Sequence, residues 1–147
     1  MRLKDKVAIV TGSGRGIGKD IALAYAREGA HVAINDIDPS TAGATAAEAA
    51  KLGVRSLTQP ADVSLKADVD RLVDAVMSEF GRIDILVNNA MKIVPGKLEE
   101  LTEEAWDTTM NIGLRGAFLL SQAAARHMSA EIWVHRQYRL DRRSVPV

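Results

Sequence analysis

The chain has 147 residues, with 19 lysines and arginines against 19 aspartates and glutamates, so its formal net charge is zero. This balance gives no basic footprint for nucleic acid, and the absence of cysteine excludes disulfides, thiolate catalysis and cysteine-ligated metal centres. No apolar run approaches the roughly 18 residues that cross a bilayer, and the N-terminus carries no signal-peptide pattern. We expect one cytoplasmic domain with no metal site and no membrane or nucleic-acid partner.

Short apolar runs alternate along the chain with longer amphipathic stretches. The apolar runs predict strands at 6–11, 31–35, 54–59 and 83–87. The amphipathic stretches predict helices at 17–28, 40–52, 65–80 and 103 to about 128, the third capped by Ser64 and the fourth by Thr102. This alternation predicts right-handed crossovers and an α/β fold built on a doubly wound parallel sheet, with strand order 3-2-1-4.

A glycine-rich stretch lies between the first strand and the first helix. Glycines allow a tight turn and close backbone approach, and the helix N-terminus offers free N–H groups and partial positive charge to a pyrophosphate. The glycine spacing is G-x-x-x-G-x-G, which differs from the G-x-G-x-x-G of other dinucleotide sites. The predicted cofactor-binding residues here are Gly12, Ser13, Gly14, Arg15, Gly16, Ile17 and Gly18.

Two other functions could use a glycine-rich loop. A P-loop needs Lys followed by Ser or Thr directly after its last glycine, whereas Lys19 and Asp20 follow Gly18 here, so we do not expect phosphoryl transfer. A methyltransferase could also combine such a loop with a ribose-binding acid, and the sequence leaves that alternative open.

Asp36 stands at the end of the second strand, where dinucleotide-binding domains carry a ribose-binding acid. A carboxylate there accepts hydrogen bonds from both ribose hydroxyls and repels a 2′-phosphate, so we predict NAD as the cofactor and NADP as the less favoured one. Arg15 could reach a 2′-phosphate, but we expect the acid to dominate, because it would lose its solvation beside a phosphate dianion. Ile37, next to Asp36, belongs to the same predicted site.

Further polar residues follow the third and fourth strands, where ligands bind in doubly wound sheets. Together with the glycine-rich stretch, these residues make residues 1 to about 130 resemble the N-terminal half of a short-chain dehydrogenase/reductase, with a Rossmann-like NAD(P)-binding domain that stops after about four strands. The matching features are Thr11-Gly12-x-x-x-Gly16-x-Gly18, Asp36, Asp62-Val63, Asn88-Asn89-Ala90 and Asn111.

The resemblance implies a role for each of these polar residues. Asp62 would contact the adenine amino group and Val63 the adenine ring, while Asn89 and Ala90 would line the adenine ribose. Asn88 would steady the strands. Asn111 would hold a water in the family's proton relay and is the one predicted catalytic residue of this chain. Met91 stands where the family usually has glycine, which implies less room for the cofactor.

The family's chemistry is reversible hydride transfer between the nicotinamide and an alcohol or carbonyl substrate. It uses a Ser, a Tyr acting as general acid and base, and a Lys four residues later that lowers the pKa of the Tyr. Tyr138 has Arg142 at that spacing instead, and arginine does not deprotonate. We therefore expect this chain to be inactive. It is either an NAD(P)-dependent oxidoreductase by descent or a non-catalytic nucleotide-binding or interaction fragment.

The tail from about residue 131 to 147 departs from the pattern, because it holds four arginines and has no usable strand period. Read from the second base of the Trp133 codon, its codons permit Gly-Ser-Ile-Val-Asn-Ile-Ala followed by Ser, which is an apolar strand. Our hypothesis is a shifted reading frame, and the alternative is a genuine divergent tail. Without a normal fifth strand we expect marginal stability or self-association, and Gly113, Gly116 and Ala117 offer a close-packing surface either between copies or within the chain.

Overall fold

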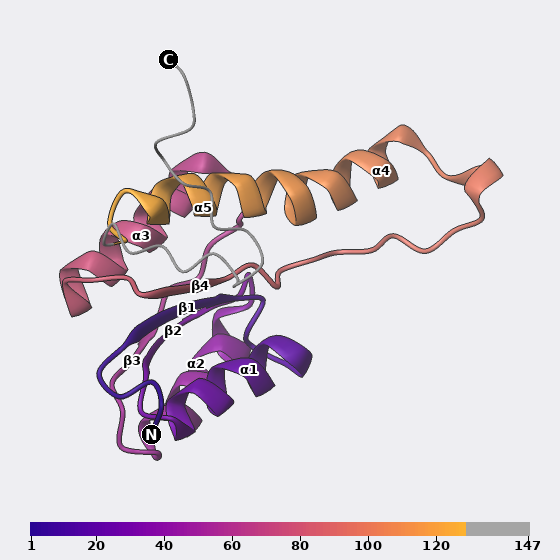
Figure 1. Ribbon diagram of the computed structural model, residues 1–147. Helices are drawn as coiled ribbons and strands as arrows, with labels where there is room; N and C mark the ends of the chain where they lie inside the picture. Colours follow the sequence, from indigo (N-terminus) through magenta and orange to yellow (C-terminus); the bar gives the residue numbers. More distant parts are fainter. Residues whose placement is uncertain (129–147) are drawn as a thin grey trace.

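The computed structural model describes residues 1–128, which form one sheet flanked by helices (Figure 1). Neighbouring strands are all parallel, and their order is β3-β2-β1-β4. The predicted doubly wound α/β architecture and its strand order are therefore confirmed. The strands are β1 Val7–Thr11, β2 His31–Asn35, β3 Ser56–Thr58 and β4 Ile85–Val87.

Helices cover both faces of the sheet, as Figure 1 shows. Helices α1 Gly16–Arg27 and α2 Pro39–Ala50 pack on one face, and α3 Lys66–Phe80 and α5 Gly116–Ala125 pack on the other. Helix α4, Glu103–Met110, continues the line of α5 beyond the sheet and buries none of its residues. No helix among the described residues is long and apolar enough to cross a membrane.

The core has two halves because alternate side chains of a strand point to opposite faces. Ile9 packs with Leu72 and Leu120 on one face, whereas Val10 packs with Ile34 on the other. All five residues of β1 are buried, because β1 has a strand on each side and helices above and below. The residues of β4 are only half-buried, since within the described chain β4 pairs with β1 alone.

The two predicted helix caps had different outcomes. Thr102 caps α4 as predicted, with its hydroxyl accepting a hydrogen bond from the N–H of Ala105 at 3.2 Å. The prediction for Ser64 is wrong, because α3 begins after Leu65, which makes no side-chain cap. The Ser64 hydroxyl instead donates to Asp62 Oδ1 at 2.7 Å, and this carboxylate draws Ser64 into a turn ahead of the helix.

The predicted fourth helix is interrupted. A 3₁₀ turn at Leu98–Glu100 precedes α4, and a π-helical turn, Asn111–Arg115, joins α4 to α5. Helix α5 ends at Ala125 and a turn reaches residue 128. The helical path thus has the predicted extent but not a uniform hydrogen-bond pattern. Asn111, the predicted catalytic residue, is the first residue of the π turn.

Candidate functional site

Residues 12–18, here called the glycine loop, connect β1 to α1 at the carboxyl end of the sheet. Gly12 adopts the left-handed backbone, with φ +60°, and a Cβ on it would stand 2.9 Å from the Cα of Ala90. A Cβ on Gly18 would stand 2.2 Å from the carbonyl oxygen of Gly12. Contacts this short exclude any side chain, so the glycines are required for the loop to fold back on itself and against the segment after β4.

Buried hydrogen bonds hold the glycine loop to the end of β2. The N–H of Ser13 donates to the carbonyl oxygen of Asn35 at 2.8 Å, and the Ser13 hydroxyl donates to that of Val10 at 2.6 Å. The N–H of Gly14 donates to Asp36 Oδ2 at 2.9 Å. The structure thus places Asp36 directly against the glycine loop, whereas its neighbour Ile37 is exposed.

The start of α1 suits an anion. Its N-cap residue, Arg15, is extended and makes no side-chain cap, and no acidic residue stands in the first turn. Arg15, Gly16 and Ile17 are all exposed there. Uncapped N–H groups and the positive end of the helix dipole therefore face outward beside Asp36, and these groups fit a pyrophosphate and its neighbouring ribose.

Asp38 is a second acid near Arg15, at the N-cap of α2. Hydrogen bonds from the Ser40 hydroxyl and the Ser40 N–H hold the pKa of Asp38 below its ordinary value, and the positive charge of Arg15 adds to this effect.

The predicted adenine-side residues, Asp62 and Val63, lie in the loop before α3. The Asp62 carboxylate accepts two hydrogen bonds from Ser64, and the N–H of Asp62 donates to Asp68 Oδ2 at 3.0 Å. The Val63 side chain is 5% exposed and packs on Gly116, where a Cβ would stand 2.8 Å from Val63 Cγ2. The Val63 side chain therefore faces α5, and of Gly113 and Gly116 it is Gly116 that packs closely within the chain.

Asn89 and Ala90 form hydrogen bonds with Thr11, at the end of β1, and with Gly12. Both backbone N–H groups donate to Thr11 Oγ1 at 3.0 Å, and Asn89 Nδ2 donates to the carbonyl oxygens of Thr11 and Gly12 at 3.0 and 3.2 Å. Asn88 Nδ2 donates to the Ser121 hydroxyl on α5 at 3.1 Å, and the expected strand-steadying role of Asn88 stays a prediction. Asn89 joins the segment after β4 to the end of β1.

Asn111 and Met91 lie on the less buried side of the molecule. Asn111 is exposed at the start of the π turn, a kind of turn that often occurs at functional sites. The hydrogen bonds that hold the glycine loop come from β2, α2 and the segment after β4, and Asn111 takes part in none of them. Met91 is 65% exposed. Tyr138, Arg142 and the tail lie outside the described residues, so the reading-frame hypothesis stays a prediction.

Three buried polar residues hold the site together, and of these only Thr11 belongs to a motif recognised in the sequence. Thr11 anchors the segment after β4, and Asn35 Nδ2 donates to the carbonyl oxygens of Gln59 and Ala61, which joins β2 to the chain after β3. Thr45 donates from α2 to the carbonyl oxygen of Gly14 at 3.1 Å. A polar residue on an otherwise apolar buried face is the signal that could have found Thr45, because such a residue needs a partner.

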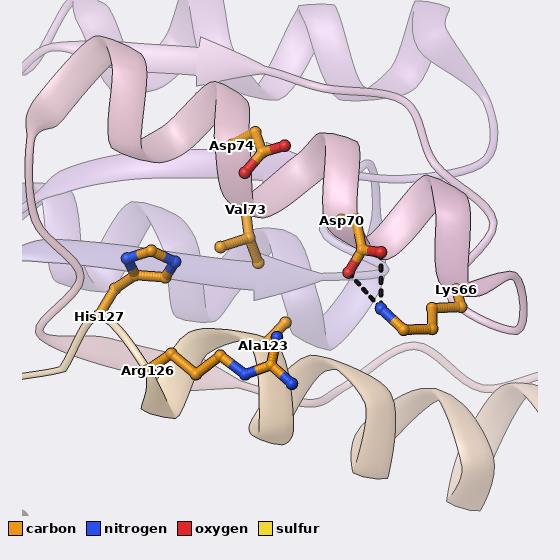
Figure 2. A pocket seen from close by; sticks show the side chains of 7 residues that line it. All are labelled: Lys66, Asp70, Val73, Asp74, Ala123, Arg126 and His127. Atoms are coloured by element: carbon orange, nitrogen blue, oxygen red, sulfur yellow. Dashed lines mark hydrogen bonds and ion pairs between the residues drawn. The ribbon is translucent and has the colours of Figure 1, made fainter.

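The hollows between helices lie elsewhere. One hollow, of about 250 Å³, lies between α3 and the end of α5. Figure 2 shows its lining, in which Lys66 pairs with Asp70 opposite Arg126 and His127. None of the predicted site residues line it, and no three His, Asp or Glu side chains among residues 1–128 are placed to hold a metal ion.

Comparison with known proteins places this geometry in a family. The family model for short chain dehydrogenases matches residues 6–134. The sorbitol dehydrogenase of Cereibacter sphaeroides is 45% identical over 130 residues, which are 88% of this chain and 50% of that protein. The galactitol 2-dehydrogenase of Agrobacterium fabrum is 42% identical over 130 residues, with the same coverage of both proteins. The chain spans about half the length of the curated relatives it matches.

Solved structures agree with the sequence relatives. A short chain dehydrogenase from Burkholderia cenocepacia, in complex with NADP, has a TM-score of 0.83 and 43% sequence identity, and the match covers 87% of this chain and 53% of that one. A hydroxysteroid dehydrogenase from Escherichia coli has a TM-score of 0.82 and 34% identity over 86% of this chain and 54% of its own. The glycine loop, the strand order and these matches together show that the chain belongs to the short-chain dehydrogenase family.

Proposed function

We propose that this chain binds the adenosine and pyrophosphate of NAD at the glycine loop and Asp36. The observation that carries the proposal is the contact between the N–H of Gly14 and Asp36 Oδ2, at 2.9 Å. It brings the ribose-binding acid within reach of the uncapped start of α1. The pyrophosphate would then lie on the first-turn N–H groups while the ribose hydroxyls donate to Asp36.

The preference for NAD over NADP rests on charge. Asp36 Oδ1 accepts one long hydrogen bond, from the N–H of Asp38 at 3.3 Å, and retains the capacity to accept another from a ribose hydroxyl. The 2′-phosphate of NADP would be repelled by the carboxylates of both Asp36 and Asp38. Arg15 could compensate, but Asp38 already lies in its field. The Burkholderia relative binds NADP, so the two cofactors have to be compared directly in this chain.

For the whole protein we propose NAD(P)-dependent oxidation of an alcohol or reduction of a carbonyl. Two of the relatives named above are dehydrogenases of sorbitol and galactitol, which supports a small alcohol as substrate, whereas the relative from Escherichia coli is a hydroxysteroid dehydrogenase. The bound nicotinamide supplies the hydride acceptor, and the residues of this chain bind the nucleotide and fix its orientation. Asn111 would hold a water on the proton path, as in the family.

The second candidate function is nucleotide binding without catalysis, and the tyrosines favour it. The chain has two tyrosines, Tyr25 and Tyr138. Tyr25 lies in the second half of α1 and packs against the core, which gives it no catalytic position. Tyr138 has Arg142 where the family has lysine. We therefore propose that this 147-residue chain binds the cofactor and does not turn over substrate.

Titration of the chain with NADH and with NADPH, followed by cofactor fluorescence, tests the proposal. We expect NADH to bind more tightly, and we expect Asp36→Asn to weaken NADH binding and narrow the difference between the cofactors. Failure of both cofactors to bind would overturn the cofactor proposal. NAD-dependent oxidation of sorbitol by the purified chain would overturn the proposal that it is inactive.

A further inference from the structure

Thr45 is a buried hydroxyl that neither the sequence motif nor the family role of the glycine loop accounts for. It lies in the middle of α2 on a face whose other buried residues are Ala42, Ala46 and Ala49, and its exposed fraction is zero. A threonine in a helix commonly bonds back to its own helix. Thr45 instead donates across to the carbonyl oxygen of Gly14, at 3.1 Å.

Gly14 is held on both sides by this arrangement. Its N–H donates to Asp36 Oδ2 at 2.9 Å, and its carbonyl oxygen accepts from Thr45. The space beside its Cα is filled by Thr41, because a Cβ there would stand 2.3 Å from Thr41 Oγ1. Thr41 and Thr45 are four residues apart, so one face of α2 supplies both contacts. The two peptide groups that flank Gly14 therefore have a fixed orientation.

We infer that Thr45 is a positioning residue for the cofactor site. By fixing the carbonyl of Gly14, Thr45 keeps the N–H of the same residue directed at Asp36 Oδ2. That hydrogen bond orients the carboxylate, so that Asp36 Oδ1 remains for the ribose. The role in cofactor binding rests on the proposed function, whereas the effect of Thr45 on Gly14 does not.

Two variants of Thr45 and one matched control separate positioning from general stability. Thr45→Val removes the hydroxyl and keeps the shape, and Thr45→Ser keeps the hydroxyl. The control is Ser56→Ala, because the Ser56 hydroxyl donates to the carbonyl oxygen of Ala46, on the same helix, at 2.9 Å but away from Gly14. All proteins are measured in a stabilising osmolyte, so that each variant is compared in the folded state.

The first measurement is NADH affinity by fluorescence. We expect Thr45→Val to weaken NADH binding by about tenfold, because the loss of one hydrogen bond leaves Gly14 less well ordered before the cofactor binds. Thr45→Ser should bind within about twofold of the unmodified chain, and Ser56→Ala should bind unchanged. Unchanged affinity in Thr45→Val, or an equal loss in Ser56→Ala, would overturn the inference.

The second measurement needs no cofactor. Amide hydrogen exchange of Gly14, followed by NMR, should be at least about tenfold faster in Thr45→Val than in the unmodified chain. In Thr45→Ser the exchange should be as slow as in the unmodified chain. Ser56→Ala should leave the Gly14 amide as it is. If the unmodified chain bound neither NADH nor NADPH, the proposed function would fail, and this exchange would still decide whether Thr45 positions Gly14. Equal Gly14 exchange in all four proteins would overturn the inference.

Discussion

The glycine loop and the segment from residue 91 to Asn111 differ in how they are held. Ser13, Gly14 and Gly18 are buried, and hydrogen bonds tie the loop to β2, α2 and the segment after β4. From residue 91 to residue 110, in contrast, no residue is buried. Large apolar side chains are exposed in this segment, among them Met91, Ile93, Leu98 and Trp106.

This difference in buried contacts indicates which of the two regions is the more rigid. Regions with few buried contacts open at low free-energy cost, whereas densely bonded ones open only with the whole domain. The described residues therefore form a densely bonded edge around the glycine loop, the proposed nucleotide site, and leave Asn111, the predicted proton-relay residue, on the exposed π turn. We expect cofactor binding to depend on single contacts at the glycine loop much more than on side chains of α4.

The largest expected effect is at the glycine loop. Gly18→Ala places a Cβ 2.2 Å from the carbonyl oxygen of Gly12 and 2.5 Å from Asn89 Nδ2, so the backbone has to shift. We expect a loss of about 3 kcal/mol in the free energy of unfolding, measured in urea. Gly43→Ala is the matched control, because Gly43 lies in α2 with no atom within 4 Å of the added Cβ. Gly43→Ala should raise the free energy of unfolding by about 0.5–1 kcal/mol. Similar changes in both variants would contradict the rigidity of the glycine loop.

The next largest effect is expected at Asp84, which directly precedes β4 and holds the amino end of this half-buried strand. Asp84 accepts from the N–H of Val7 at 2.9 Å and from Arg82 Nε at 2.8 Å. Burial acts to raise the pKa of Asp84, but these hydrogen bonds and the charges of Arg82 and Lys6 outweigh it and hold the pKa below its ordinary value. Asp84→Ala should cost about 2 kcal/mol at neutral pH, measured by urea unfolding.

The pH dependence follows from the direction of that shift. A carboxylate with a lowered pKa in the folded state stabilises the fold above its unfolded-state pKa of about 4 and loses this contribution as the pH falls through the lower folded-state value. The difference between the unmodified chain and Asp84→Ala should therefore shrink on acidification below about pH 4. Asp70→Ala, which breaks an exposed pair with Lys66, should cost less than about 0.5 kcal/mol. A difference that grew in acid would contradict the assigned role of Asp84.

A smaller effect is expected at Gly116, where α5 touches the adenine-side loop. Gly116→Ala places a Cβ 2.8 Å from Val63 Cγ2 and 3.2 Å from the carbonyl oxygen of Val63. The side chain can turn but the carbonyl cannot, so we expect a loss of about 1.5 kcal/mol and weaker NADH binding. Gly113→Ala, with no atom within 4 Å, should show neither effect. Equal results for both glycines would mean that α5 does not constrain the loop.

The smallest effect is expected at an exposed apolar side chain of α5. Phe118 is 60% exposed, so Phe118→Ser should change the free energy of unfolding by no more than about 0.5 kcal/mol. The measurement is repeated over a range of protein concentrations. A larger loss that increases with concentration would show that Phe118 is buried between copies, in support of the predicted self-association.

Most of the fold could be predicted from the sequence because it depends on local patterns. The glycine loop and Asp36 meet as predicted, since consecutive parallel strands bring their carboxyl ends together. The errors arose where a tertiary contact or a competing side chain decides. Asp62 takes Ser64 away from the helix cap, so that α3 begins after Leu65. Thr45 finds its partner 31 residues away, which no local pattern reveals.

The π turn between α4 and α5 also bears on how chains of this family are compared. Its hydrogen bonds reach one residue farther than those of an α-helix, so the turn absorbs an extra residue without rotating the helices on either side. Elsewhere in a helix, losing one residue rotates everything beyond it by about 100°. Relatives that are one residue shorter in this helix should therefore carry their gap between Asn111 and Arg115, and an alignment that places the gap outside this turn would misassign the helix face of the residues between that gap and the turn.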